Sequence, residues 1–190
     1  MTDITPLSYE DFLNEGSATW NSVADYIHGV NVTKGFWPEN VADRNVGEAL
    51  CLIHSEISEA FEAVVTGDQD DKIPEYSGFS AEIADTMIRV LDLGGALGAD
   101  FDTINWYDTE GVVTVSPFTS VVEDLLVAHL LVSRALEHDR KGRREDMLAE
   151  LVSLFAYCME LLYKHGIPLA VIFDKVAYNI GRPFKHGKAY

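Results

Sequence analysis

Apolar positions at helical spacing dominate the middle of the chain. Between Val46 and Val65 the apolar residues recur every three or four positions and form one stripe. The same period resumes from Ser80 to Gly98, after the polar connection GDQDDKIPEYSGF. A polar loop between two periodic segments indicates two antiparallel helices. The sequence therefore predicts a helical hairpin over about residues 45–99.

A second pair of periodic segments lies in the last third of the chain. VVEDLLVAHLLVSRALEHDRKG and REDMLAELVSLFAYCMELLYKHG predict another hairpin over about 119–165, after loop or extended chain from Asn105 to Thr119. An N-terminal helix is expected from Ser8 to Val30, with Gly16 as its weakest point. No strand-like alternation is sustained anywhere. We predict an all-α helical bundle, a single domain over residues 1–190, in which N-terminal and C-terminal helices accompany the two hairpins.

The two predicted hairpins resemble each other in sequence. HSEISEAFEA, which begins at His54, aligns with HLLVSRALEH, which begins at His129, and the two share serine, alanine and glutamate at matching positions. The similarity indicates a degenerate duplication, although chance similarity between two amphipathic helices is an equally open explanation. Under this alignment Glu56 corresponds to Leu131. Only the first hairpin keeps its acids.

The charge and cysteine content limit the partners and the compartment. A formal net charge of −17 argues against nucleic acid or an anionic membrane surface as a partner, because both would repel the chain. Cys51 and Cys158 have apolar neighbours and predict buried free thiols in a reducing compartment. The N-terminus lacks the features of a signal peptide, and no run reaches the roughly 18 apolar residues of a membrane span. We expect a cytoplasmic protein, in the host cytoplasm if a phage encodes it.

Two acidic pairs stand at three-residue spacing on the first hairpin. Glu56 and Glu59 share one face of the first helix, and Glu82 and Asp85 share one face of the second. A solvated face would usually mix signs, yet Asn45 to Asp71 holds seven acids and no lysine or arginine. In an antiparallel hairpin the pairs come level and offer four carboxylates to one hard cation. This set predicts a Mg²⁺ site, with Mn²⁺ as a substitute, and a solvated polar face is the alternative.

These acids carry a family resemblance. EISE at Glu56, followed after 22 intervening residues by EIAD at Glu82, resembles the ExxE…ExxD metal motif of all-α nucleoside triphosphate pyrophosphohydrolases, the MazG-like and dimeric dUTPase-like group. KGFW, GEALCLIHSEISEAFEA, FSAEIADTMIRVLDLGGALG and KVAYNIGRPFKHGKAY are similar to a MazG-like branch common in bacteria and phages. Ser55 departs from the pattern, because many members have a glutamate directly before the first ExxE.

The resemblance implies a reaction and its catalytic groups. A (deoxy)nucleoside triphosphate would be hydrolysed to a monophosphate and pyrophosphate, with Mg²⁺ held by the four acids and a water attacking the α-phosphorus. Glu59 is the expected general base, with Glu56 as the second catalytic carboxylate. The resemblance also implies a homo-oligomer, a dimer or a tetramer. The alternative is that the hairpin over 119–165 replaces the helices of a partner subunit.

The C-terminal segment 175–190 is the basic part of this acidic chain. Its cations include Lys175, Arg182 and Lys185, which suit a triphosphate because arginine forms forked phosphate contacts and lysine acts as a point charge. A solubilising tail would have the same composition. The resemblance favours the first interpretation, because Lys175, Asn179 and Arg182 are similar to a phosphate-contacting set on the last helix of family members.

Other residues leave more than one interpretation open. Trp37, beside Phe36 in KGFWPEN, would either stack on a nucleobase or anchor its loop in the core. His138 and Asp139, with His129, would suit an HD-type nucleotide phosphohydrolase. A non-catalytic helical interaction module that kept the scaffold is the non-enzymatic alternative.

Overall fold

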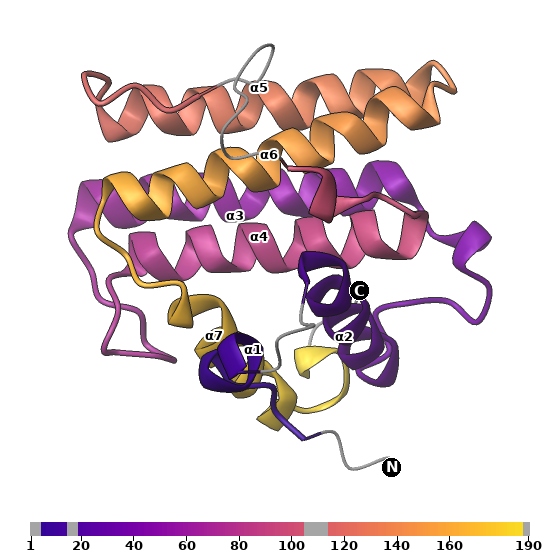
Figure 1. Ribbon diagram of the computed structural model, residues 1–190, viewed down its shortest axis with the longest axis horizontal. Coiled ribbons are helices and arrows are strands. Elements are labelled where there is room, and N and C mark those ends of the chain that lie inside the picture. Colours follow the sequence, from indigo (N-terminus) through magenta and orange to yellow (C-terminus); the bar gives the residue numbers. More distant parts are fainter. Residues whose placement is uncertain (1–4, 15–18, 105–113, 188–190) are drawn as a thin grey trace.

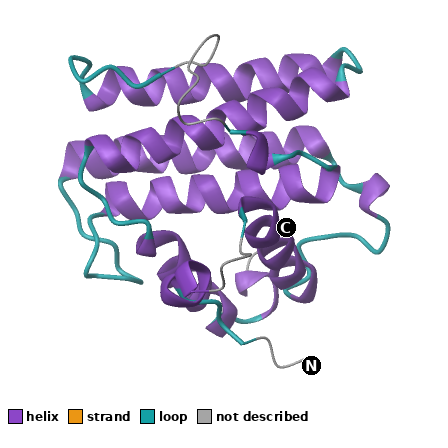
Figure 2. Cartoon of the chain, in the orientation of Figure 1, coloured by secondary structure: helices purple, strands orange, loops and turns teal. Residues whose placement is uncertain are grey.

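The computed structural model describes residues 5–14, 19–104 and 114–187, and this part of the chain is helical (Figures 1 and 2). It contains no strand, only an isolated bridge between Gln69 and Ser77, so the predicted all-α class is confirmed. None of these helices is long and apolar enough to cross a membrane. The α-helices are α1 (Tyr9–Asn14), α2 (Trp20–Thr33), α3 (Val46–Thr66), α4 (Gly78–Leu97), α5 (Val121–Arg140), α6 (Arg144–Lys164) and α7 (Ala170–Gly181).

The N-terminal region forms two helices, so the single helix predicted from Ser8 to Val30 is wrong in its extent. Ser8 caps α1 as predicted, because its Oγ accepts a hydrogen bond from the Asp11 amide at 3.1 Å. Thr19 has an extended backbone and caps α2 through a reciprocal capping box with Ser22. An N-cap residue of this kind begins a new helix. Gly16 lies outside the described residues.

The two predicted hairpins form a four-helix bundle. α3 packs against α4 and α5, and α6 packs against the same two helices. In Figure 1 these four helices cross the upper part of the molecule, and α1, α2 and α7 lie below α4. The second hairpin therefore covers one side of the first hairpin, and the terminal helices cover the other.

α3 and α5 meet in a regular antiparallel register. The Nδ1 atoms of His54 and His129 lie 2.7 Å apart, and a Cβ on Gly47 would lie 3.9 Å from Leu136 Cδ1. Gly47 precedes His54 by seven residues on α3, and Leu136 follows His129 by seven residues on α5, so the two helices run antiparallel in register. His54 and His129 are also the residues that the sequence alignment of the hairpins places together. Their contact is the one that two repeated hairpins would make at a local two-fold axis.

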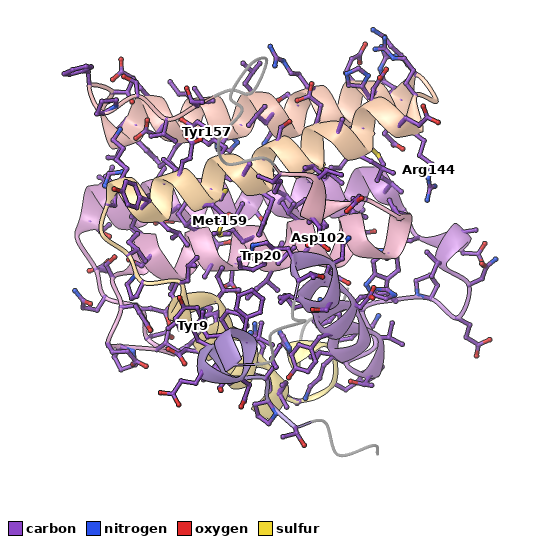
Figure 3. All side chains as sticks on the ribbon, in the orientation of Figure 1. Tyr9, Trp20, Asp102, Arg144, Tyr157 and Met159 are labelled. Carbon is purple, nitrogen blue, oxygen red and sulfur yellow. The ribbon has the colours of Figure 1, made fainter. Side chains whose placement is uncertain are left out.

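α4 is the central helix of the molecule. It contacts α2, α3, α6 and α7, and 14 of its 20 residues are buried. α2 approaches it closely, because a Cβ on Gly95 would lie only 2.9 Å from the Cβ of Ala24. Trp20 of α2, labelled in Figure 3, also contacts α6. Its ring centroid lies 4.8 Å from that of Phe155. This packing fixes α4 and the acids that it carries.

The two cysteines differ in burial. Cys158 is buried in α6, and burial raises the pKa of its thiol to about 12, so it is an inert core residue. Cys51 is exposed, and the prediction of a buried thiol there is wrong. It stands two positions, a rotation of roughly 200°, from the buried Ile53 on α3 and so faces outward.

Two helical glycines should respond in opposite directions to alanine. A methyl group added at Gly29 in α2 would meet no neighbouring atom within 4 Å, so Gly29→Ala should raise the free energy of unfolding by about 0.5–1 kcal/mol. Gly95→Ala should lower it by about 1–3 kcal/mol, because its methyl group would collide with Ala24. Urea unfolding at pH 7.5 measures both. Equal effects at the two positions would contradict the close α2–α4 packing.

The histidine pair should make the bundle sensitive to acid. Burial lowers the pKa of both imidazoles, and for His54 the neighbouring His129 adds to the lowering. As the pH falls below about 6.5 the unfolded chain takes up protons that the folded chain resists, so the unfolding free energy should fall. Replacing both residues by leucine should weaken this dependence between pH 7.5 and 5.5.

The control for that experiment is Gly95→Ala, which should also lower stability but leaves His54 and His129 in place. Urea unfolding at both pH values should leave its acid dependence close to that of the parent protein. If the double leucine variant loses as much stability on acidification as the parent, the histidine pair does not cause the effect.

Candidate functional site

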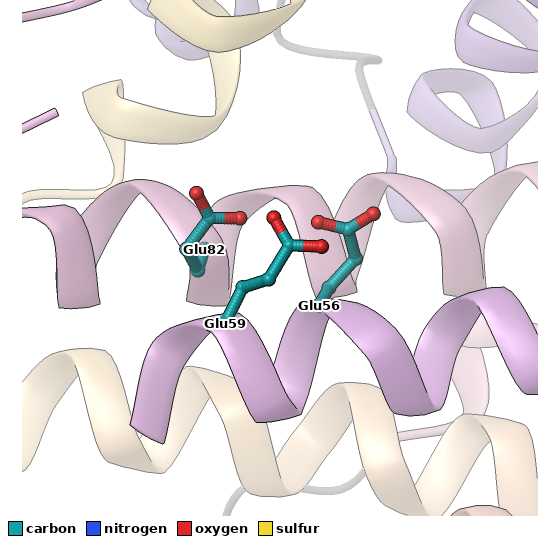
Figure 4. Close-up of side chains that lie close together, drawn as sticks. All are labelled: Glu56, Glu59 and Glu82. Atoms are coloured by element: carbon teal, nitrogen blue, oxygen red, sulfur yellow. The ribbon is translucent and has the colours of Figure 1, made fainter. Parts of the chain in front are cut away.

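Three of the four predicted metal ligands meet between α3 and α4. Each of Glu56, Glu59 and Glu82 offers a carboxylate oxygen, and these three atoms lie within 4.8 Å of one another (Figure 4). Glu56 and Glu59 project together because they are three residues apart on α3, and the antiparallel α4 brings Glu82 level with them. Glu56 and Glu82 are buried, whereas Glu59 is exposed.

Glu82 is the member of this three-glutamate cluster with the least favourable electrostatics. Its Oε2 is buried and has no hydrogen-bond partner among the described residues. Burial, with a further contribution from the carboxylates of Asp85 and Glu56, raises the pKa of Glu82 to about 8. A buried carboxylate oxygen without a donor, in a cluster with two other carboxylates, fits a hard cation with oxygen ligands such as Mg²⁺.

Asp85, the fourth predicted ligand, is held by a different partner. Its Oδ2 lies 3.3 Å from the ammonium of Lys175, and it lines the same cavity without joining the three-glutamate cluster. Burial raises the pKa of Asp85 to about 6, against the opposing effect of Lys175. Its role as a metal ligand stays a prediction.

Lys175 is buried, with its side chain 1% exposed, and it does not line the cavity. Its ammonium also contacts Asp70 at 3.1 Å, and Asp70 in turn accepts backbone hydrogen bonds from Lys72 and Ile73 in the α3–α4 connection. Lys175 therefore joins α7 to the connection and to α4. Lys175 contacts Asp85 and is absent from the cavity lining, so the phosphate contact expected of it gains no support here.

The three-glutamate cluster opens into a cavity of about 720 Å³. Asn179 and two cations of the C-terminal segment line it, and their contact with phosphate stays a prediction. The Oδ1 of Asn179 is buried without a hydrogen-bond partner among the described residues. Acids and bases thus face one another across the same space. The basic residues that line it are Arg44, Lys72, Arg89, Arg182 and Lys185.

Hydrogen bonds between two segments that are distant in the sequence hold the C-terminal cations in place. The Lys34 ammonium donates to the carbonyls of Ile180 and Arg182, and the Lys34 carbonyl accepts from the Lys185 amide at 2.8 Å. Gly35 has a φ of 80°, and the Phe184 ring occupies the space that a side chain there would need. The KGFW loop therefore positions Arg182 and Lys185 at the cavity.

Trp37 anchors this loop. Its side chain is 9% exposed, and its Nε1 donates to both oxygens of Asp92 on α4, at 2.9 and 3.0 Å. Asp92 also contacts His28 and accepts from Asn31 of α2. The anchoring interpretation of Trp37 accounts for these contacts. Trp37 still lines the cavity, where the Arg44 guanidinium lies 5.7 Å from its ring centroid, so its contact with a base stays a prediction.

Arg89, which was not predicted from the sequence, compensates part of the acidic charge. Its Nη2 lies 2.5 Å from the Oε1 of Glu56, across the α3–α4 interface. The segment that carries the acids of α3 has no basic residue, and α4 supplies one cation to it instead. The signal was present, since Arg89 follows Asp85 by four residues and so lies on the acid-bearing face.

The histidines do not assemble an HD-type site. His129 contacts His54, whereas His138 lies 3.3 Å from Asp146 and 3.9 Å from Glu150 at the far end of α5. Within the described residues, the group of metal-binding side chains that comes together is the three-glutamate cluster. The geometry therefore gives the HD-type alternative no support.

Acidic and basic side chains line the cavity together. No protein-family model matches the chain, and neither a curated protein nor a solved structure matches it. The chemistry of the cavity is therefore the main guide to function. Six acids, three of them in the cluster, and five lysine or arginine residues line the cavity, which suits a ligand that brings both a divalent metal and negative charge, such as a metal–phosphate complex.

Metal binding at this site should depend on pH. Below a pH of about 8 Glu82 holds a proton that a metal must displace, so Mg²⁺ affinity should rise by up to about tenfold per unit between pH 6 and 8. Titration calorimetry in two buffers of different ionisation enthalpy would detect the released proton. Glu82→Gln should bind Mg²⁺ weakly and without that release. An affinity that is constant over this range would contradict the assignment of Glu82.

Proposed function

We propose that the protein is a Mg²⁺-dependent nucleoside triphosphate pyrophosphohydrolase, which converts a (deoxy)nucleoside triphosphate to a monophosphate and pyrophosphate. The observation that carries the proposal is the three-glutamate cluster, with the unpartnered oxygen of Glu82, in a cavity that basic residues also line. The volume of about 720 Å³ suits a nucleotide-sized ligand. The sequence resemblance to the MazG-like group points to the same reaction.

The residues divide into a metal side and a phosphate side. Glu56, Glu59 and Glu82 would hold the metal, and Asp85 would support the set from its contact with Lys175. Bound Mg²⁺ would neutralise phosphate charge and lower the pKa of a nearby water. Arg182 and Lys185 would bind the phosphates. The unpartnered Asn179 Oδ1 would accept a hydrogen bond from a hydroxyl of the sugar or an amino group of the base. Leu52 and Ile88 give the cavity an apolar wall against which a base or sugar can pack.

The chemical step needs one base and one leaving group. Glu59 is the exposed carboxylate of the cluster and would accept a proton from the attacking water. The water oxygen forms a bond to the α-phosphorus, and the bond from that phosphorus to the bridging oxygen of the β-phosphate breaks. The electron pair leaves with pyrophosphate, and the monophosphate keeps the water oxygen.

The test is product analysis with a matched pair of variants. Each common ribo- and deoxyribonucleoside triphosphate is incubated with the protein and Mg²⁺, and ³¹P NMR identifies the products. We expect a monophosphate and pyrophosphate, and a loss of about 10²–10⁴-fold in kcat for Glu59→Gln with an unchanged circular dichroism spectrum. Glu62→Gln is the control, because Glu62 is an exposed acid of α3 outside the cluster.

Three results would contradict the proposal in different ways. A diphosphate with orthophosphate would place the attack at the terminal phosphorus. Full activity in Glu59→Gln would remove the assigned base. No turnover of any triphosphate by folded, magnesium-binding protein would favour the non-catalytic interaction module instead.

A further inference from the structure

Arg89 forms an ion pair with one of the carboxylates that a metal would need. Its Nε and Nη2 lie 2.6 and 2.5 Å from a single oxygen, Oε1 of Glu56. The Glu56 side chain is 7% exposed and that of Arg89 30% exposed, so water screens the pair little on the glutamate side. Arg89 also lines the cavity, where a ligand can reach it.

This ion pair and a bound metal oppose each other. A metal ligated by Glu56 would lie close to the guanidinium, and the two cations would repel and compete for the same carboxylate charge. Arginine stays protonated at any ordinary pH, so it cannot relieve the conflict by losing its proton. Metal binding alone must therefore work against Arg89.

A triphosphate would reverse the sign of this interaction. Its phosphate oxygens accept hydrogen bonds from the planar fork of a guanidinium, and they also ligate divalent metals. With the triphosphate present, a phosphate oxygen can replace Glu56 as the partner of Arg89 or share Arg89 with it. The positive charge of Arg89 then favours the complex. The same side chain then opposes free metal and favours metal with phosphate.

We propose that Arg89 couples metal binding to triphosphate binding, which makes the site respond to the metal–triphosphate complex more than to free metal. The inference rests on the proposed function of the cavity and adds to it a control on when the metal site fills. Coupling of this kind is reciprocal, so saturating magnesium should also tighten triphosphate binding, and Arg89 should account for part of that factor.

The test measures binding and needs no turnover. Titration calorimetry at pH 7.5 follows Mg²⁺ alone, and then an α,β-imido triphosphate that resists the reaction, with and without saturating Mg²⁺. Arg89→Ala should bind Mg²⁺ alone about 5–10-fold more tightly and the imido analogue in Mg²⁺ about tenfold more weakly. Arg89→Lys keeps the charge and loses the fork, so its affinity for Mg²⁺ alone should stay within about twofold of the parent value while analogue binding falls.

Arg44→Ala is the matched control. Arg44 lines the same cavity, but its carboxylate partner is Glu48, at 2.7 Å, outside the three-glutamate cluster. Its loss should change the affinity for Mg²⁺ alone by less than about twofold. Arg89→Gln repeats the removal of charge with a longer polar side chain, so failure of Arg89→Ala to fold does not remove the test.

The outcomes separate this inference from the proposed function. Unchanged or weaker Mg²⁺ binding in both Arg89→Ala and Arg89→Gln would overturn the coupling role and leave the metal site standing. Tighter Mg²⁺ binding with undiminished analogue binding would overturn the phosphate half of the role. If the parent and all variants bind no Mg²⁺, the metal site and the inference both fail.

Discussion

The structure depends on the burial of acidic groups between α3 and α4. A buried carboxylate is costly unless a cation, a proton or a hydrogen-bond donor accompanies it. The fold meets this constraint in three ways: Glu56 contacts Arg89, Asp85 contacts Lys175, and Glu82 has a pKa raised by burial to about 8. The first two solutions use cations of the protein itself. The third leaves a carboxylate oxygen without a partner among the described residues, and a bound metal would supply one.

α7 and the KGFW loop, which lie outside the four-helix bundle, position the cations near this acidic interface. α7 brings Lys175 to the back of Asp85, and the KGFW loop, anchored through Trp37 on Asp92, fixes the C-terminal cations at the front. The second hairpin covers the opposite side of α3 and α4 and, within the described residues, contributes no acid to the cluster. Its antiparallel register with α3 is centred on the contact between His54 and His129.

Most of the helices and the convergence of three acids could be predicted from the sequence, because both depend on the spacing of residues along a helix. The apolar stripe of α3 sets which face is buried, and three-residue spacing on an antiparallel hairpin then predicts that both acidic pairs converge. Glu56, Glu59 and Glu82 do so, whereas Asp85 contacts Lys175. The partners of the acids were not predictable in the same way. The contact of Arg89 with Glu56 and the burial of Lys175 depend on how separate helices pack, and a lysine in a basic tail gives no sign that it will be 1% exposed. Thr19 was missed because its cap was hidden inside a longer helical period.

The central claim is that the three glutamates bind a divalent metal, and diffraction from crystals grown with Mn²⁺ tests it most directly. We predict an anomalous difference peak about 2.0–2.3 Å from carboxylate oxygens of Glu56, Glu59 and Glu82, with Glu82 Oε2 among the ligands. Addition of a non-hydrolysable triphosphate should strengthen that peak and place phosphate oxygens on the metal. A crystal with ordered Mn²⁺ only elsewhere on this acidic protein, or with none at saturating concentration, would contradict the claim.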